Sequence, residues 1–244
     1  MNSGLYAAFS AFAARMDALD VVANNLANGS TTGYKAQHEF YRSLPAWLQP
    51  SLTTPINSAV NHYGVLGGAS LDLTPGSLQP TGNDTDVALE GKGFFTVLTK
   101  NGLRYTRAGN FSLNPQRQLV TAQGDLVMGD QGAIQIPVGE LAISPDGTIS
   151  VGGTLVSKLK IADFADETQL APESNAYFAA PQAAAKPATD VSVSQGNLEA
   201  SNSDPVRTSV ALIELQRSAQ LMEKALSIFH NEFNRTAAVQ IPQV

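Results

Sequence analysis

Cysteine is missing from the 244-residue chain, so disulfide bonds and thiolate metal sites are excluded. Basic residues are scarce as well: 15 Lys and Arg stand against 21 Asp and Glu, for a formal net charge of −6. Because phosphate contacts need clustered Lys and Arg, and these are scattered, the composition argues against a nucleic-acid partner. No apolar run is long enough for a transmembrane helix. The apolar N-terminal stretch has no preceding Lys or Arg, so no cleaved signal peptide is expected.

Motifs for catalysis and cofactor binding are also lacking. None of the three histidines, His38, His62 and His230, has a second metal-ligating residue three or four positions away. The glycines of "EGKGFF" at 90–95 lack the strand–turn–helix context of a dinucleotide-binding loop and are better explained as a turn. We therefore expect a protein that is not an enzyme, with no catalytic, cofactor-binding or metal site and no small-molecule substrate.

Both ends of the chain show the alternating three- and four-residue spacing of a heptad helix. At the N-terminal end this seam consists of Leu5, Phe9, Phe12, Met16, Leu19, Ala23 and Leu26. At the C-terminal end it consists of Leu212, Leu215, Ala219, Met222, Leu226, Phe229 and Phe233, after an Asp204–Pro205 helix start. The matching seams predict an antiparallel, coiled-coil-like pair of terminal helices.

The N-terminal helix also has an apolar back, formed largely by alanines from Ala7 to Ala18 and by Val21. A helix that is apolar nearly all round must be buried on more than one side. Two interpretations fit: an ordinary core helix, or a helix packed between its partner helix and neighbouring molecules.

Between the helices, short apolar runs alternate with turn signals, among them an Asp146–Gly147 hairpin. The expected fold is α+β: the terminal helix pair, an extended arm and a compact antiparallel β domain. The expected divisions are an N-terminal helix and turn (1–34), a connector or arm (35–83), a β-rich outer domain (84–178), a linker and return strand (179–203), and a C-terminal helix (204–244).

The exit from the N-terminal helix is unusual, because Asn24, Asn25 and Asn28 fill its last turns. Asparagine usually weakens a helix interior, since its amide competes for backbone hydrogen bonds. Gly29 permits a left-handed helix end, and a Ser-Thr-Thr-Gly turn through Gly33 then leads to Tyr34. We expect this stretch to be a junction between the helix and the rest of the molecule.

Four separated stretches resemble, in order, the signature motifs of one family, the axial rod and hook proteins of the bacterial flagellum. They are "ANNLANGSTTGYK" at 23–35, "TPGSLQPTGNDTDVALEGKGFF" at 74–95, "RYTRAGNFSLNPQRQLVTAQGDLVMG" at 104–129, and "SQGNLEASNSD" at 194–204 followed by "LIELQR" at 212–217. The chain is identified as a member of the basal-body rod proteins and, from its short length, is most similar to proximal rod members.

The resemblance implies a structural subunit of the basal-body rod, which spans the periplasm. Such proteins leave through the flagellar type III export apparatus without a cleaved signal peptide. They polymerise with themselves and with other axial proteins into a helical tube that encloses the export channel and transmits motor torque. The heptad seams would then be polymerisation surfaces, and Asn24, Asn25 and Asn28 would make polar contacts between subunits.

Other interpretations stay open at this point. Within the family, the chain could be a distal rod or another axial protein. Outside it, a secreted β-rich enzyme or binding module, or a coiled-coil adhesin or phage-tail tube component, would share parts of the pattern.

The terminal helices would order only on assembly if one helix pair buries too little apolar surface to offset the entropy of ordering.

Overall fold

The computed structural model describes residues 2–42, 65–165 and 169–240, and these divide between two compact units. The helical unit takes the described residues of Met1–Ala27, Gln37–Ser70 and Pro205–Val244. The β unit takes those of Asn28–Ala36 and Leu71–Asp204. The chain therefore enters the β unit directly after α1 in sequence, returns to the helical unit after Ala36, re-enters the β unit at Leu71, and leaves it for the last time at Asp204.

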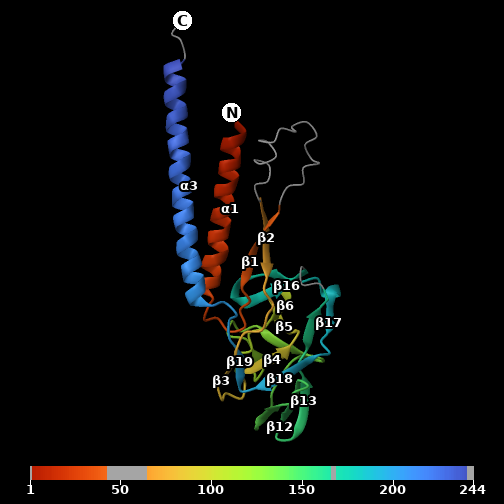
Figure 1. Cartoon of the computed structure of the whole chain (residues 1–244). Helices are drawn as coiled ribbons and strands as arrows, with labels where there is room; N and C mark the ends of the chain where they lie inside the picture. Colours follow the sequence, from red (N-terminus) through yellow and green to blue (C-terminus); the bar gives the residue numbers. More distant parts are fainter. Residues whose placement is uncertain (1, 43–64, 166–168, 241–244) are drawn as a thin grey trace. The chain divides into compact units, whose positions relative to one another are not determined.

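The helical unit contains two long helices, α1 (Asn2–Ala27) and α3 (Pro205–Gln240), which contact each other (Figure 1). The Asp204–Pro205 helix start predicted from the sequence is confirmed, because Pro205 is the first residue of α3. This position suits proline, whose missing N–H would have no partner in the first helical turn. Two strands, β1 (Gln37–Arg42) and β2 (Val65–Leu71), pair in a two-stranded sheet.

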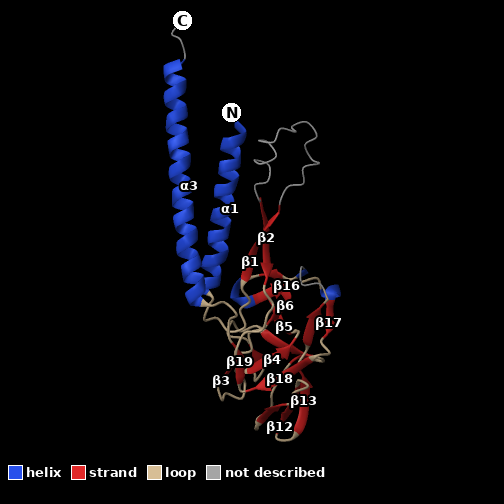
Figure 2. Ribbon diagram, viewed as in Figure 1, coloured by secondary structure: helices blue, strands red, loops and turns tan. Residues whose placement is uncertain are grey.

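The regular structure of the β unit consists mainly of short strands joined by loops (Figure 2), together with the short 3-10 helices η3 (Ser174–Ala176) and η4 (Gln182–Ala184). The strands before residue 130 are β3 (Leu78–Pro80), β4 (Val87–Gly91), β5 (Phe94–Thr99), β6 (Gly102–Thr106), β7 (Ser112–Leu113), β8 (Leu119–Val120) and β9 (Leu126–Gly129). Those after it are β10 (Gly132–Ala133), β11 (Leu141–Ile143), β12 (Thr148–Val151), β13 (Thr154–Lys158), β14 (Ile161–Phe164), β15 (Ala171–Pro172), β16 (Tyr177–Ala179), β17 (Ala185–Pro187), β18 (Val191–Gln195) and β19 (Asn197–Glu199).

The strands of the β unit pair antiparallel throughout its described residues. The largest sheet runs β15-β16-β6-β5-β9-β8-β7, with β10, β14 and β17 attached to its side. A three-stranded sheet, β11-β12-β13, contains the predicted Asp146–Gly147 hairpin, which is confirmed by the Leu141↔Val151 to Ile143↔Ile149 register. The predicted α+β class with an antiparallel β unit is therefore confirmed.

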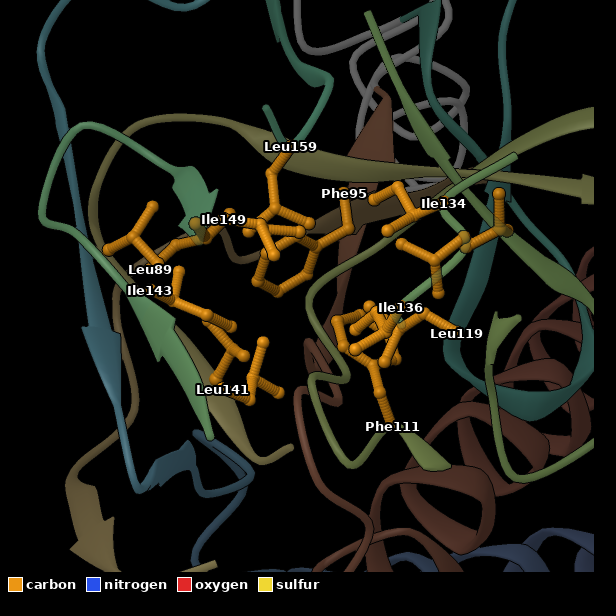
Figure 3. Close-up of a cluster of buried hydrophobic side chains, with 14 of the residues drawn as sticks. Leu89, Phe95, Phe111, Leu119, Ile134, Ile136, Leu141, Ile143, Ile149 and Leu159 are labelled. Atoms are coloured by element: carbon orange, nitrogen blue, oxygen red, sulfur yellow. The ribbon is translucent and has the colours of Figure 1, made fainter. Parts of the chain in front are cut away.

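The core lies on both faces of β5, because successive side chains of a strand point in opposite directions. Phe95 and Val97 face the larger apolar cluster, where Phe95 packs edge-on to Phe111 with centroids 5.1 Å apart (Figure 3). Phe94 faces a second cluster and packs edge-on to Phe178 at 5.3 Å. The near-continuous apolar run "FFTVL" therefore marks a central strand that is buried on both sides.

Residues 179–203, expected to be a linker and one return strand, contribute four elements to the β unit. The alanine- and proline-rich part contains η4 and β17, and β17 pairs with β14. Further on, β18 pairs with β4 over five residues and β19 pairs with β3. Low sequence complexity predicts a linker, but strand partners elsewhere in the chain supply the hydrogen bonds that the local sequence does not specify.

Replacing Phe95 by Ala should destabilise the β unit by about 3–5 kcal/mol, because the ring is fully buried and leaves a cavity beside Phe111. The measurement is urea unfolding of the full chain followed by near-ultraviolet circular dichroism. Val138→Ala is the control, since Val138 is 85% exposed and its truncation should change the free energy of unfolding by less than about 0.5 kcal/mol. Equal effects of the two changes would contradict this core.

A buried hydroxyl makes the β unit sensitive to alkaline pH. The Tyr177 hydroxyl lies 2.7 Å from Thr121 Oγ1 and 2.8 Å from Asp125 Oδ2, to which it donates. Burial raises the pKa of Tyr177 above its ordinary value of 10.0, and the hydrogen bond to Asp125 raises it further. The folded state therefore keeps this proton at a pH where the unfolded chain loses it.

This tyrosine should contribute stability that is fully present below pH 10 and is lost as the pH rises above it. Tyr177→Phe removes the titrating group. The difference in free energy of unfolding between wild type and the variant should therefore shrink from about pH 9 to about pH 11, a range that brackets the ordinary tyrosine pKa. Urea midpoints measured across this range test the idea. Parallel curves for the two proteins would show that the Tyr177 proton is not linked to folding.

Candidate functional site: a buried ionic junction in the β unit

Two segments that adjoin the long helices in sequence are bonded to each other inside the β unit. Residues 28–36 follow α1, and residues 197–204 precede α3. The Gly33 N–H donates to the Glu199 carbonyl at 2.8 Å, and the Ala36 N–H donates to Asn202 Oδ1 at 2.7 Å. These bonds hold the incoming and outgoing chain together over a few residues.

A buried ion pair lies where these segments meet. Lys35 Nζ is 2.6 Å from Glu199 Oε1, and both side chains are 1% exposed. Lys35 also donates to the Thr74 carbonyl at 2.8 Å, and the same carboxylate oxygen accepts the Gly76 N–H at 3.0 Å. Residues from three parts of the chain thus meet at one carboxylate.

Arg107, which follows β6, is the second cation of this site. Its Nη1 lies 3.4 Å from Glu199 Oε2, and its Nη2 donates to the Gly91 carbonyl at 2.6 Å. The guanidinium lies 5.3 Å from the ring centroid of Phe94, within range of a cation–π contact. We call Lys35, Arg107 and Glu199 the ionic junction.

The ionic junction is electrostatically demanding, because two buried cations share one carboxylate. Burial is the largest effect on both cations and lowers the pKa of Lys35 and that of Arg107, while Glu199 acts in the opposite direction on each. Asp72 and Asp163 favour the charged forms of Lys35 and Arg107 respectively over a longer range. Removing one partner from such a buried set typically costs about 3–5 kcal/mol, because a charge is left uncompensated.

Gly33 allows the segment after α1 to approach Arg107 closely. Its φ is +66°, and a Cβ at this position would overlap the backbone of Arg107 and Ala108. The predicted left-handed residue was Gly29, and this is wrong: Gly29 is not among the described glycines with positive φ. α1 ends at Ala27, Thr31 donates to the Asn28 carbonyl and side chain, and the left-handed turn comes four residues after Gly29.

The asparagines near the end of α1 make bonds within the chain. In the helical unit, Asn25 is buried, donates to the Gln37 carbonyl at 2.7 Å and accepts the Gln37 N–H at 2.9 Å, as a strand partner would. Asn24 donates to the Asp20 carbonyl one turn earlier. In the β unit, Asn28 bonds to Tyr34, whose pKa is raised chiefly by burial. Contacts of these asparagines between subunits stay a prediction.

The predicted seam residues differ in exposure within the helical unit. On α1, Ala14 and Ala18 are buried, whereas Met16 of the seam is 44% exposed and Ala23 is exposed. On α3, Ala219 of the seam is buried. The other described seam side chains are partly buried: Phe12, Leu19, Leu26, Leu212, Leu215, Met222 and Leu226. Leu5, Phe9, Phe229 and Phe233 have side chains outside the described part of the structure.

The sequence pointed to Gly33 and Tyr34 as junction residues but missed the three charges beside them. Lys35, Arg107 and Glu199 each lie inside one of the four motif stretches, within runs of turn-forming and apolar residues. A charge in such a setting is an available signal of a buried ionic site. The sequence does not reveal that these three charges meet, because Lys35 and Glu199 are 164 residues apart.

Gly33→Ala should destabilise the β unit by about 2–4 kcal/mol, since the methyl group adds a backbone clash to an unfavourable φ. Gly82→Ala is a matched control: its φ is +70°, but a Cβ there meets nothing within 4 Å, so only the conformational cost of about 1–2 kcal/mol remains. Thermal unfolding of both full-length variants measures the difference. Equal losses would mean that the close approach to Arg107 contributes nothing.

In the described part of the chain, neither long helix has a stretch apolar enough to cross a membrane. The family described as "Flagella basal body rod protein" matches residues 5–35, which include Lys35 of the ionic junction. The family described as "Flagellar hook protein FlgE/F/G D1 domain" matches residues 88–151, which include Arg107 and much of the β unit. The two matches therefore fall on both units.

Relatives match over nearly the whole chain. The basal-body rod protein FlgF of Caulobacter vibrioides is 35% identical over 230 residues, or 93% of each chain. FlgF of Salmonella typhimurium is 31% identical over 249 residues, covering 95% of this chain and 96% of its own. The rod protein FlgG of Agrobacterium fabrum is 33% identical over 237 residues, covering 86% and 88%.

These relatives confirm the resemblance drawn from the four motif stretches and do not favour a secreted β-rich binding module. The chain is most like FlgF. It therefore belongs to the flagellar basal-body rod protein family, a family of structural proteins and not of enzymes.

Proposed function

We propose that this chain is a rod subunit that polymerises through its two long helices into a helical tube. The observation that carries the proposal is the apolar surface left on α1 and α3 in a single chain. On α3, five large apolar side chains are at least half exposed: Val206, Val210, Ile213, Leu221 and Ile228. A helix that presents apolar residues on its solvent side fits one buried by neighbouring subunits.

The seam residues and the five exposed apolar residues of α3, called the exposed row, have different proposed roles. The seam pairs with α1, and the exposed row contacts other subunits. Partial burial of Leu212, Leu215 and Met222 and full burial of Ala219 support an α3 seam directed at α1, in a coiled-coil-like antiparallel pair. The exposed row and Met16 remain for other subunits. The asparagines predicted to make contacts between subunits would add polar bonds at the end of α1, with Asn25 already engaged within the chain.

The energetics favour assembly by many copies over a stable pair. Fully burying a Val, Leu or Ile side chain contributes about 1.5–3 kcal/mol. Association costs about 4–15 kcal/mol in lost freedom, so one small interface gives little surplus. Head-to-tail contacts repeated along an open helical filament place each subunit between several neighbours. Such a tube would enclose an export channel and carry motor torque through parallel interfaces.

We also propose which proteins the subunit assembles with and how it reaches the rod. The subunit would assemble with other axial proteins of the flagellum and reach the periplasm-spanning rod through the type III export apparatus, without a cleaved signal peptide. Helices that order fully only on assembly would suit passage through a narrow pore. Residues 1–34 and 204–244 would form the inner helical layer, residues 84–178 the outer β layer, and residues 35–83 and 179–203 would connect the layers.

Leu19→Asp and Leu226→Asp, tested separately in the full chain, should abolish motility in a strain that lacks the wild-type protein. A carboxylate on either helix cannot be buried without a large desolvation cost. Because both positions lie in the helical unit, the free energy of unfolding of the β unit should change by no more than is typical of surface substitutions, about 0.5 kcal/mol. The assays are swimming in soft agar and circular dichroism.

Val138→Asp introduces the same charge at an exposed position of the β unit and is the matched control, so its carrier should swim normally. If cells that carry Leu19→Asp and cells that carry Leu226→Asp both swim normally, polymerisation through the helices is refuted. A large loss of β-unit stability in those variants would instead support a single core shared by helix and sheet.

A further inference from the structure

The ionic junction combines charges from three distant parts of the sequence. Lys35 and Arg107 lie 164 and 92 residues before Glu199, the carboxylate with which both form ion pairs. A chain that emerges from its N-terminal end therefore presents both cations well before the carboxylate with which they pair. During that interval the two cations have no partner in the outgoing segment.

Closing the β unit without Glu199 would bury both cations against mostly uncharged groups. Lys35 would keep the Thr74 carbonyl, and Arg107 would keep the carbonyls of Leu89 and Gly91. A buried cation with hydrogen bonds but no compensating anion is strongly disfavoured relative to its solvated form. An open β unit, in which water solvates both cations, avoids this cost.

The segment that carries Glu199 also completes the sheets. Strand β18 pairs with β4 from Val191↔Gly91 to Gln195↔Val87, and β19 pairs with β3 from Asn197↔Pro80 to Glu199↔Leu78. Val193 of β18 belongs to the larger apolar cluster. Ion pairing of the two cations, pairing of two strands and completion of the core therefore depend on one short stretch near the end of the β unit.

We propose that Glu199 is a charge lock on folding: the β unit closes around Lys35 and Arg107 only when residues 191–202 are in place. Until then the N-terminal strands stay open, although they contain most of the apolar core. The lock acts within one chain, so the inference goes beyond the rod function and stands without it. It gives the fold a built-in order in which the last strands decide when the first ones close.

Glu199→Gln in the full chain tests the electrostatic part, since it keeps the size of the side chain and removes its charge. The ratio of folded to unfolded β unit should fall about 100-fold, with a thermal midpoint about 10 °C lower, because two cations lose their anion. Glu90→Gln, at an exposed position of β4, is the control and should leave the midpoint unchanged. Equal midpoints for the two variants would overturn the proposal.

A second substitution separates a charge lock from a lost contact. Adding Lys35→Met to Glu199→Gln removes one uncompensated cation, so the double variant should have a higher midpoint than Glu199→Gln alone. If Lys35 and Glu199 contributed only packing and hydrogen bonds, the double variant would be less stable than Glu199→Gln alone. That result would refute the charge lock. If Glu199→Gln alone does not fold, a double variant that folds supports the lock and a double variant that stays unfolded refutes it.

The order of folding is tested on wild-type protein by pulse-labelled hydrogen exchange during refolding of the full chain. Amides of β5, β6 and β9 should gain protection in the same kinetic phase as those of β18 and β19. Protection of β5, β6 and β9 in an earlier phase than β18 and β19 would show that the unit closes without its last strands. The lock would then be refuted.

Discussion

One buried carboxylate, that of Glu199, is the interaction on which the β unit depends. It is paired with Lys35 and Arg107 and accepts the Gly76 N–H, so segments from the start, the middle and the end of the unit meet at its two oxygens. Buried ion pairs add little net stability compared with apolar packing, but an incomplete one is costly. The ionic junction therefore fixes these segments relative to one another, because moving one of them away would leave a buried charge without its ion-pair partner.

The two units differ in how much of their apolar surface is buried within a single chain. The β unit buries both faces of β5 and completes its apolar clusters within one chain. The helical unit leaves a row of apolar side chains on α3 and Met16 on α1 exposed to solvent. This contrast is what the proposed polymerisation through the helices requires, since a single chain leaves a row of apolar residues exposed on the helices. The bonds between Gly33 and Glu199 and between Ala36 and Asn202 tie together the two segments that lead to those helices.

Much of the fold follows from local patterns. The heptad spacing predicted both helices, Asp204–Pro205 the start of α3, and Asp146–Gly147 a hairpin, because each pattern acts over a few neighbouring residues. The conformation of the chain after α1 was not predicted correctly. Gly29 has the residue type for a left-handed stop, but Gly33 adopts that conformation, since only there does the chain press against the backbone of Arg107 and Ala108. Asn25, which looked free for other subunits, serves the start of β1.

By itself, the sequence determined the family, the α+β class and the absence of an enzymatic motif, because motif order and periodicity are properties of the linear chain. Only the tertiary structure decided which charges are buried and which segments they join. In the sequence, Lys35, Arg107 and Glu199 are three charges in separate motif stretches, with nothing to show that they meet. They become a junction because strand pairing brings positions up to 164 residues apart within hydrogen-bond distance, where water no longer screens them.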